Sequence, residues 1–116
     1  MEHRKRVYIE SPYRGDILRN EAYAKVAMLD SINRGEAPFL GHLLYTQILN
    51  DSVEAERSLG IALGSAWLLE ANLVAFYIDL GWSPGMIESL RLLKTAKLRI
   101  PHETRRVKED VLNSFR

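Results

Sequence analysis

The sequence predicts a small α/β domain in which about four parallel strands are flanked by helices and followed by a C-terminal helical tail. Short β-prone runs alternate along the chain with segments of helical periodicity, and strands separated by helices favour a parallel sheet. Leu73 to Ile78 is almost continuously apolar, as expected for a strand covered on both faces. The 116 residues, 47% hydrophobic and 27% charged, are ordinary for one globular domain.

The first half of the chain provides two strands and a helix. A first strand is expected at Val7 to Ile9. A helix should run from about Asp16 to Asn33, because apolar residues recur there at helical spacing and Gly35 supplies a stop. Ala37 to Leu40 is a plausible short strand.

The middle of the chain is less regular. Gly41 and His42 are expected to form a turn, and Leu43 to Leu49 fits either a loop with a short helical turn or a longer strand. Asp51 followed by Glu54 resembles a capping box. It would start a helix from about residue 52 to residue 70.

The last part of the chain should complete the sheet. After the strand at 73–78, a third helix is expected from about Pro84 to Ala96 and a fourth strand over Leu98 to Pro101. Residues 103–116 are charged and read as a terminal helix or a partly ordered tail. The whole chain, 1–116, is therefore predicted to be one domain with a core at about 6–102.

Gly60 and Gly64 lie four residues apart on one face of the second long helix. Glycine inside a helix costs about 1 kcal/mol relative to alanine, which indicates a packing reason. The face can pack on the sheet or on another helix, or it can leave room for a ligand. A small sheet with edges to cover also favours a homo-oligomer, a dimer or larger.

Composition excludes several classes of function. The chain has no cysteine, so it lacks disulfides, thiolate metal sites and a cysteine nucleophile. A net charge of +1 makes no general case for nucleic-acid binding, and the longest apolar run is too short for a membrane helix. Three distant histidines match no metal-ligand spacing, so we expect no metal and no cofactor. The N-terminus does not resemble a signal peptide, so a cytoplasmic location is expected.

The most informative segment runs from Asp79 to Met86, where an apolar strand ends and a helix begins. Ser83 suits the N-cap of that helix, and Pro84 suits its first position. Free N–H groups at such a helix start favour an anionic group such as a phosphate. Three loops should meet at this edge of the sheet, over residues 11–15, 41–45 and 79–85, and ligands of α/β sheets bind there.

Several motifs follow one another in a familiar order: Val7 to Gly15, then Asn20, Pro38-Phe39, His42 to Tyr45, Glu56-Arg57 and Ser83 to Met86. With these the chain resembles the nucleoside 2-deoxyribosyltransferase-like superfamily, in its short phage and prophage branch, over about residues 6–102. The resemblance implies a small flavodoxin-like or Rossmann-like fold and an oligomer whose pockets are completed by a neighbouring subunit. It also implies enzymes that cleave or exchange the N-glycosidic bond of nucleosides or nucleotides.

The chain departs from that superfamily at the catalytic position. The superfamily's glutamate falls four residues after the glycine of Gly-Met, and Ser89 stands there, one residue after Glu88. One residue is about 100° of rotation on a helix. Either the helix starts differently and Glu88 attacks the sugar, assisted by Asp79 or Tyr13, or the nucleophile is lost and the pocket holds its ligand without cleaving it.

Twelve residues are candidates for ligand binding, and several of them also have a structural alternative. Tyr13 and Arg14 can form a plain surface turn, His42 can be structural, and Arg57 can be an exposed helix residue. Trp82 can stack on a base or cover a subunit interface. The full set is Ser11, Tyr13, Arg14, Gly15, His42, Arg57, Asp79, Trp82, Ser83, Gly85, Met86 and Ser89.

The sequence favours two functions. One is a binding protein for a nucleotide or ADP-ribose-like molecule, used by a phage to sequester a host-defence nucleotide signal in the host cytoplasm. The other is an N-glycoside hydrolase or 2-deoxyribosyltransferase. A protein-interaction module is the third possibility. The basic run Arg105 to Lys108 reads as a solvated face, although Arg105 or Phe115 could reach a neighbour's pocket in an oligomer.

Overall fold

The computed structural model describes residues 3–95 and 99–115, and its centre is a parallel sheet of four strands. The strands β1 (Arg6–Glu10), β2 (Ala37–Phe39), β3 (Leu73–Tyr77) and β4 (His102–Arg105) lie in the order β2-β1-β3-β4. All three neighbouring pairs are parallel. The expected α/β architecture with a C-terminal helix is confirmed.

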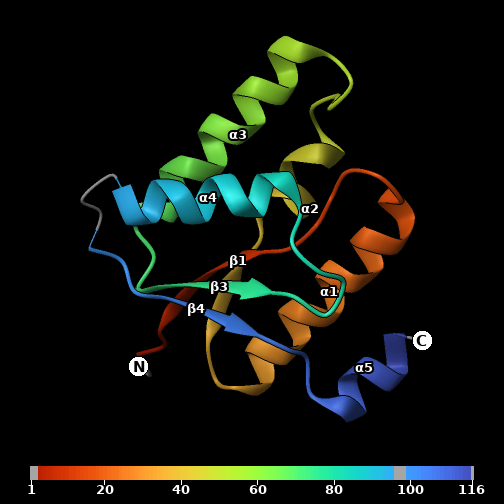
Figure 1. Cartoon of the computed structure of the whole chain (residues 1–116), viewed down its shortest axis with the longest axis vertical. Coiled ribbons are helices and arrows are strands. Elements are labelled where there is room, and N and C mark those ends of the chain that lie inside the picture. The colour runs from red at the N-terminus through yellow and green to blue at the C-terminus, as the bar shows by residue number, and fades with distance from the viewer. Residues whose placement is uncertain (1–2, 96–98, 116) are drawn as a thin grey trace.

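Helices cover both faces of the sheet (Figure 1). On one side lie α1 (Ile17–Asn33) and α5 (Glu109–Phe115), and on the other lies α4 (Pro84–Thr95). The short α2 (Gly41–Leu44) and a 3₁₀ turn (Tyr45–Gln47) lead to α3 (Glu54–Leu68), which projects away from the sheet beyond α4. None of the described helices is long and apolar enough to cross a membrane.

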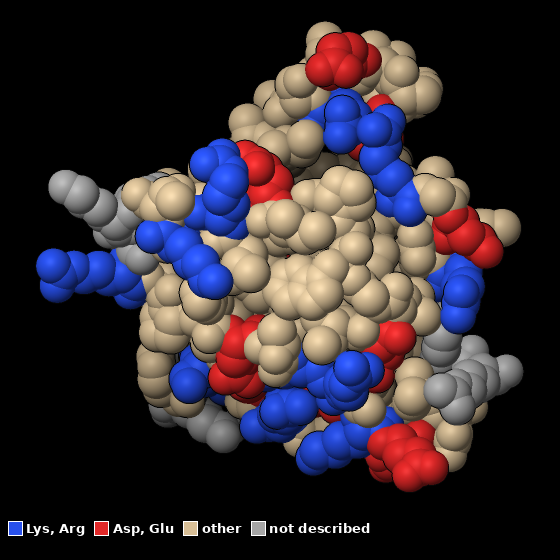
Figure 2. Space-filling model, in the orientation of Figure 1, with Lys and Arg blue, Asp and Glu red and all other residues tan. Residues whose placement is uncertain are grey.

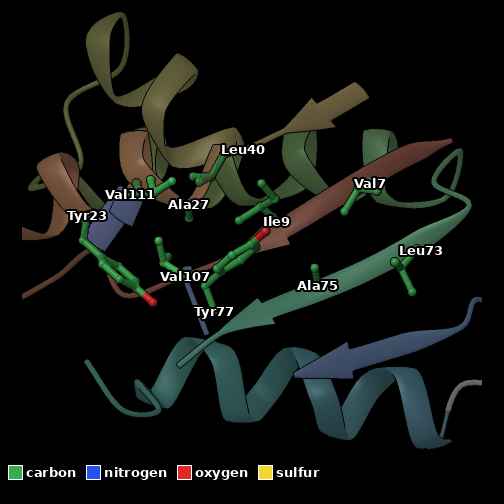
Figure 3. Packing of buried hydrophobic residues seen from close by; sticks show 11 residues of the cluster. Val7, Ile9, Tyr23, Ala27, Leu40, Leu73, Ala75, Tyr77, Val107 and Val111 are labelled. Atoms are coloured by element: carbon green, nitrogen blue, oxygen red, sulfur yellow. The ribbon is translucent and has the colours of Figure 1, made fainter. Parts of the chain in front are cut away.

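Alternation along the strands divides the core into two clusters, because successive side chains of a strand point to opposite faces. Val7 and Ile9 of β1 pack with α1 and α5, together with the alternate residues Leu73, Ala75 and Tyr77 of β3 (Figure 3). The residues between them, Tyr8, Val74 and Phe76, pack with Met86 and Leu93 of α4. The face to which a strand residue belongs therefore follows from its position in this alternation.

The predicted fourth strand is wrong by several residues. We expected Leu98 to Pro101, of which residue 98 lies outside the described part of the chain, but the pairing register joins Val74 to His102. The reason is that β4 is an edge strand with three exposed side chains out of four, so hydrophobicity does not mark it. The charged segment after residue 103 is consequently part strand, and its helix begins only at Glu109.

Two expectations in the middle of the chain also need correction. Gly41 and His42 do not form a turn but begin α2. Residues 43–49 continue as short helical turns and not as a strand. The capping box does not form, because α3 begins at Glu54 after Val53. Asp51 instead lies near Arg14.

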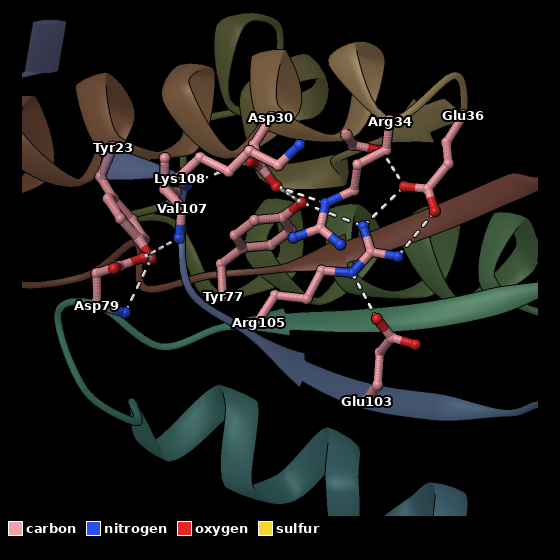
Figure 4. A network of polar contacts seen from close by, with 11 residues as sticks. Tyr23, Asp30, Arg34, Glu36, Tyr77, Asp79, Glu103, Arg105, Val107 and Lys108 are labelled. Atoms are coloured by element: carbon pink, nitrogen blue, oxygen red, sulfur yellow. Dashed lines mark hydrogen bonds and ion pairs between the residues drawn. The ribbon is translucent and has the colours of Figure 1, made fainter. Parts of the chain in front are cut away.

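A buried polar network fixes the C-terminal segment on the α1 side of the sheet (Figure 4). The Arg105 guanidinium donates to both carboxylate oxygens of Glu36, at 2.7 and 2.8 Å, and to Glu103. Asp30, fully buried, accepts from Arg34, Tyr77 and the backbone N–H of Lys108. Arg105 is therefore not part of a solvated face and is not free to reach a neighbour's pocket.

Candidate functional site

A cavity of about 800 Å³ opens on the α4 side of the sheet, at the carboxyl end of β1 and between α3 and α4. In the view of Figure 2, in which α3 stands above α4, charged residues gather around the edges of the molecule and an uncharged area lies at its middle. The cavity lies at the point where the strand order reverses around β1, which is where ligands of open α/β sheets bind. Its polar lining is contributed by Tyr8, Glu10, Ser11, Tyr13, Arg14, His42, Tyr45, Thr46, Asp51, Glu56, Arg57, Ser65, Ser83, Glu88 and Ser89.

One polar pair at the cavity wall joins β1 to α4. Glu10, two residues after Tyr8, points to the same face of the sheet, and the Ser89 hydroxyl donates to its Oε1 at 2.9 Å. Burial raises the pKa of the Glu10 carboxyl from its ordinary 4.5 to about 7, against the opposing effect of the Ser89 hydrogen bond. This carboxyl therefore changes its charge close to neutral pH.

The structure also decides which of two neighbouring residues faces the cavity from α4. Ser89 is half-buried and holds Glu10, whereas Glu88 lies at the rim with its side chain 56% exposed. Glu88 accepts two hydrogen bonds from Arg91, the shorter at 2.6 Å. The helix does not start one residue early, so Glu88 is not directed at the cavity interior.

The start of α4 forms as the sequence predicts. The Ser83 hydroxyl accepts a hydrogen bond from the backbone N–H of Met86 at 3.2 Å, and its carbonyl accepts from Ile87. Ser83, Gly85 and Met86 all line the cavity, and the Met86 side chain is buried. The positive end of the α4 dipole therefore lies at the cavity wall.

The loop after β1 is held against α2. Ser11 Oγ lies 3.1 Å from His42 Nε2, and the rings of His42 and Tyr13 are 5.1 Å apart. Burial lowers the pKa of His42 to about 4, so its ring is uncharged at neutral pH. Its Nδ1 is buried and has no hydrogen-bond partner among the residues that the structure describes. Asn20 of α1 fixes the loop by donating to the carbonyls of Tyr13 and Arg14.

The outer part of the cavity carries charges of both signs. Arg57 and Glu56 line it from α3, while Arg14 forms a loose ion pair with Asp51, at 3.7 Å. Arg14 keeps 63% of its side chain exposed, so the ion pair leaves the guanidinium accessible.

The two glycines of α3 face the cavity. A Cβ added at Gly64 would lie 2.9 Å from the Tyr8 hydroxyl, and one added at Gly60 would meet Leu49 and Tyr45 at ordinary contact distances. Gly64 therefore meets a packing need of its own fold, because only glycine lets α3 approach the end of the Tyr8 side chain this closely.

Three of the predicted ligand residues lie outside this cavity. Asp79 continues the alternation of Tyr77, so it turns to the α1 face, where it accepts from the Tyr23 hydroxyl and from the N–H of Val107. The Trp82 ring packs on Phe76 at 5.2 Å and covers the core. Gly15, with φ +101, shapes the loop after β1, and a Cβ added there would have no neighbour within 4 Å.

A protein-family model, described as a domain of unknown function (DUF7768), matches residues 5–103. The chain belongs to the DUF7768 family. The match contains β1 to β3 and α1 to α4, and with them every described residue that lines the cavity. Among curated proteins no relative of this DUF7768 chain was found.

Sequence reasoning missed one central residue of this DUF7768 domain, Glu10. It belongs to the motif Val7 to Gly15 but was not among the predicted ligand residues, although a signal was present. An acid at the end of an apolar strand is costly to bury and points to the face of the residue two positions earlier. Within the described residues no group of three or more metal-ligating side chains occurs.

Proposed function

We propose that this DUF7768 protein binds a nucleotide or ADP-ribose-like small molecule in the cavity between α3 and α4. The proposal rests on the side chain of Ser89, which lines the cavity. At this position the resemblance to the superfamily predicts a catalytic glutamate, and this chain has a hydroxyl group instead. A pocket that keeps its loops but has no carboxylate at that position is suited to holding its ligand rather than cleaving it.

The chemistry of the lining supports a ligand with an anionic and an uncharged part. Arg14 and Arg57, together with the N-terminus of α4, can hold phosphate oxygens. Apolar residues of α3 and α4 provide contact area for a base or sugar. The volume of about 800 Å³ falls within the roughly 300–1,000 Å³ of small-molecule sites.

The biological setting proposed here comes from the resemblance alone. It includes membership in the nucleoside 2-deoxyribosyltransferase-like superfamily, a phage origin, and sequestration of a host-defence nucleotide signal in the host cytoplasm. A homo-oligomer belongs to the same proposal. It is supported by the apolar residues that α3 leaves exposed, Leu59, Ile61, Leu63 and Trp67.

Binding is tested by incubating the purified protein with a panel of AMP, NAD and ADP-ribose, followed by denaturation and analysis of what is released. We expect one of these to be retained and recovered intact. Recovery of free base and sugar phosphate would instead show cleavage and refute a pure binding role. Arg14→Ala and Arg57→Ala should each weaken retention, whereas Lys25→Ala, which removes a cation of α1 outside the cavity, should not.

The alternative function is an N-glycoside hydrolase or 2-deoxyribosyltransferase, and one observation keeps it open. Glu10 brings a carboxyl into the cavity interior next to the position that Ser89 occupies. Such a carboxyl can stabilise positive charge at an anomeric carbon. Base release that Glu88→Gln leaves intact and Glu10→Gln abolishes would establish this activity and replace the binding role.

A further inference from the structure

The Glu10 carboxyl is a buried acid that no described residue of the fold pairs with a cation. Its one hydrogen bond to the described protein comes from Ser89, and none of the described ion pairs involves it. Two acids on the opposite face differ sharply, because Asp30 and Glu36 are each held by an arginine. Burying a carboxyl without a cation is unfavourable, so its position at the cavity wall points to a ligand.

We infer that Glu10 recognises the sugar of the ligand by accepting hydrogen bonds from two adjacent hydroxyl groups. This inference rests on the proposed function and names the part of the ligand that would lie between β1 and α4. A carboxylate has about four acceptor positions, and Ser89 occupies one of them, on Oε1. A vicinal diol offers two donors at the spacing of the two carboxylate oxygens.

The distribution of charge in the cavity favours hydroxyl groups over a phosphate group beside Glu10. No described cation pairs with Glu10, so an anionic group beside it would meet repulsion without compensation. The guanidinium groups of Arg14 and Arg57 instead come from the loop after β1 and from α3. A ligand with its phosphate toward the arginines and its sugar toward Glu10 satisfies both ends.

Acceptance of two hydrogen bonds requires the ionised carboxylate, so this contact makes affinity depend on pH. Two neighbours keep one charge state between about pH 6 and pH 8: burial lowers the pKa of His42 to about 4, and burial raises that of the Tyr8 phenol far above this range. The other titratable or charged groups that face the cavity are Arg14, Tyr13, Tyr45, Asp51, Glu56, Arg57 and Glu88.

The test measures the Kd of ADP-ribose by calorimetry at about pH 6 and about pH 8. ADP-ribose is chosen because it has no phosphate monoester, a group that itself titrates near pH 6. With a pKa of about 7, the ionised fraction of Glu10 falls from about nine-tenths to about one-tenth over this range, so binding should weaken about tenfold at the lower pH.

Two variants and one further pair of ligands make the assignment specific. Glu10→Gln should bind ADP-ribose at least about tenfold more weakly at about pH 8 and should lose the pH dependence. Glu54→Gln, the same change at an exposed position of α3 outside the cavity, should behave as the unmodified protein. AMP should bind the unmodified protein more tightly than 2′,3′-dideoxy-AMP, and Glu10→Gln should not distinguish the two.

The outcomes separate this inference from the proposed function. Equal affinity at both pH values, equal binding by Glu10→Gln, or no preference for the diol would overturn the role of Glu10 while leaving nucleotide binding in place. Failure of ADP-ribose, NAD and AMP to bind at any pH overturns the proposed function and this inference together. A carbon-13 NMR titration provides a second readout, because the Glu10 carboxyl pKa should fall when ADP-ribose binds.

Discussion

Replacing Glu10 by glutamine should stabilise the protein at alkaline pH, although it removes a group assigned to ligand binding. Burial raises the carboxyl pKa from 4.5, its ordinary value, to about 7. A group whose pKa is higher in the folded state contributes stability that is fully present below its unfolded pKa and is lost as the pH rises through its folded pKa. For Glu10 this window lies between about pH 4.5 and pH 7.

The size of the effect follows from the shift. A change of about 2.5 pKa units corresponds to about 3 kcal/mol of unfolding free energy. Glutamine does not titrate and can still accept from the Ser89 hydroxyl. Glu10→Gln should therefore be more stable than the unmodified protein at about pH 8, and most of this advantage should disappear by about pH 5.

Urea denaturation of the unmodified protein and of Glu10→Gln, each at about pH 5 and about pH 8, measures how the difference in unfolding free energy between them changes with pH. Titration of all other groups cancels when the variant is compared with its parent at each pH. Glu54→Gln, the same change at an exposed side chain of α3, is the control against which the Glu10→Gln difference is compared. An advantage of Glu10→Gln that is the same at both pH values would refute the reasoning, since it would show that Glu10 is not a titrating buried acid.

Three further changes test the surrounding contacts. Ser89→Ala removes a hydrogen bond to the ionised carboxylate and should raise the Glu10 pKa by about one to two units, measured by carbon-13 NMR. Arg105→Ala leaves the largely buried Glu36 carboxylate without its cation and should cost about 3–5 kcal/mol in urea denaturation. Asp79→Ala should cost about 2 kcal/mol by the same assay yet leave ADP-ribose affinity within about twofold, because the hydrogen bonds of that carboxylate to described residues lie on the α1 face.

Elements with a strong local signal could be predicted from the sequence. The α1 helix has regular apolar spacing, an Asp16 side chain that caps it, and Gly35 after its end. The strand β3 is buried at every position. Ser83 caps α4 as expected. In each case residues close in sequence determine the conformation, so periodicity and capping rules are sufficient.

Elements that depend on tertiary contacts could not be predicted in the same way. The prediction for β4 was wrong because its side chains at His102, Glu103 and Thr104 are exposed, and its pairing with β3 is made by the backbone. The sequence around Arg105 predicts a solvated cation, because its partner Glu36 is far away in the sequence and lies beside it only in the folded structure. No local pattern reports such a partner.

Strand alternation explains why Glu10 lines the cavity whereas Asp79 does not. Asp79 and Glu10 each follow a buried strand at the same edge of the sheet, and sequence alone made Asp79 the stronger candidate. Yet Tyr77 packs toward α1 whereas Tyr8 packs toward α4. Each acid lies on the same face as the tyrosine two residues before it, so the two acids lie on opposite faces of the sheet. Asp79 meets Tyr23 and the tail, whereas Glu10 reaches the cavity.

The same geometry gives a reason why Ser89 and Glu10 belong together. Their side chains meet across the gap between α4 and β1 at 2.9 Å, so a glutamate at position 89 would bring a second carboxyl against the first. Two carboxylates at that distance cannot both remain ionised in a buried site. A chain that carries an acid at position 10 is therefore expected to have a hydrogen-bond donor rather than a second acid at position 89, and Ser89 is such a donor.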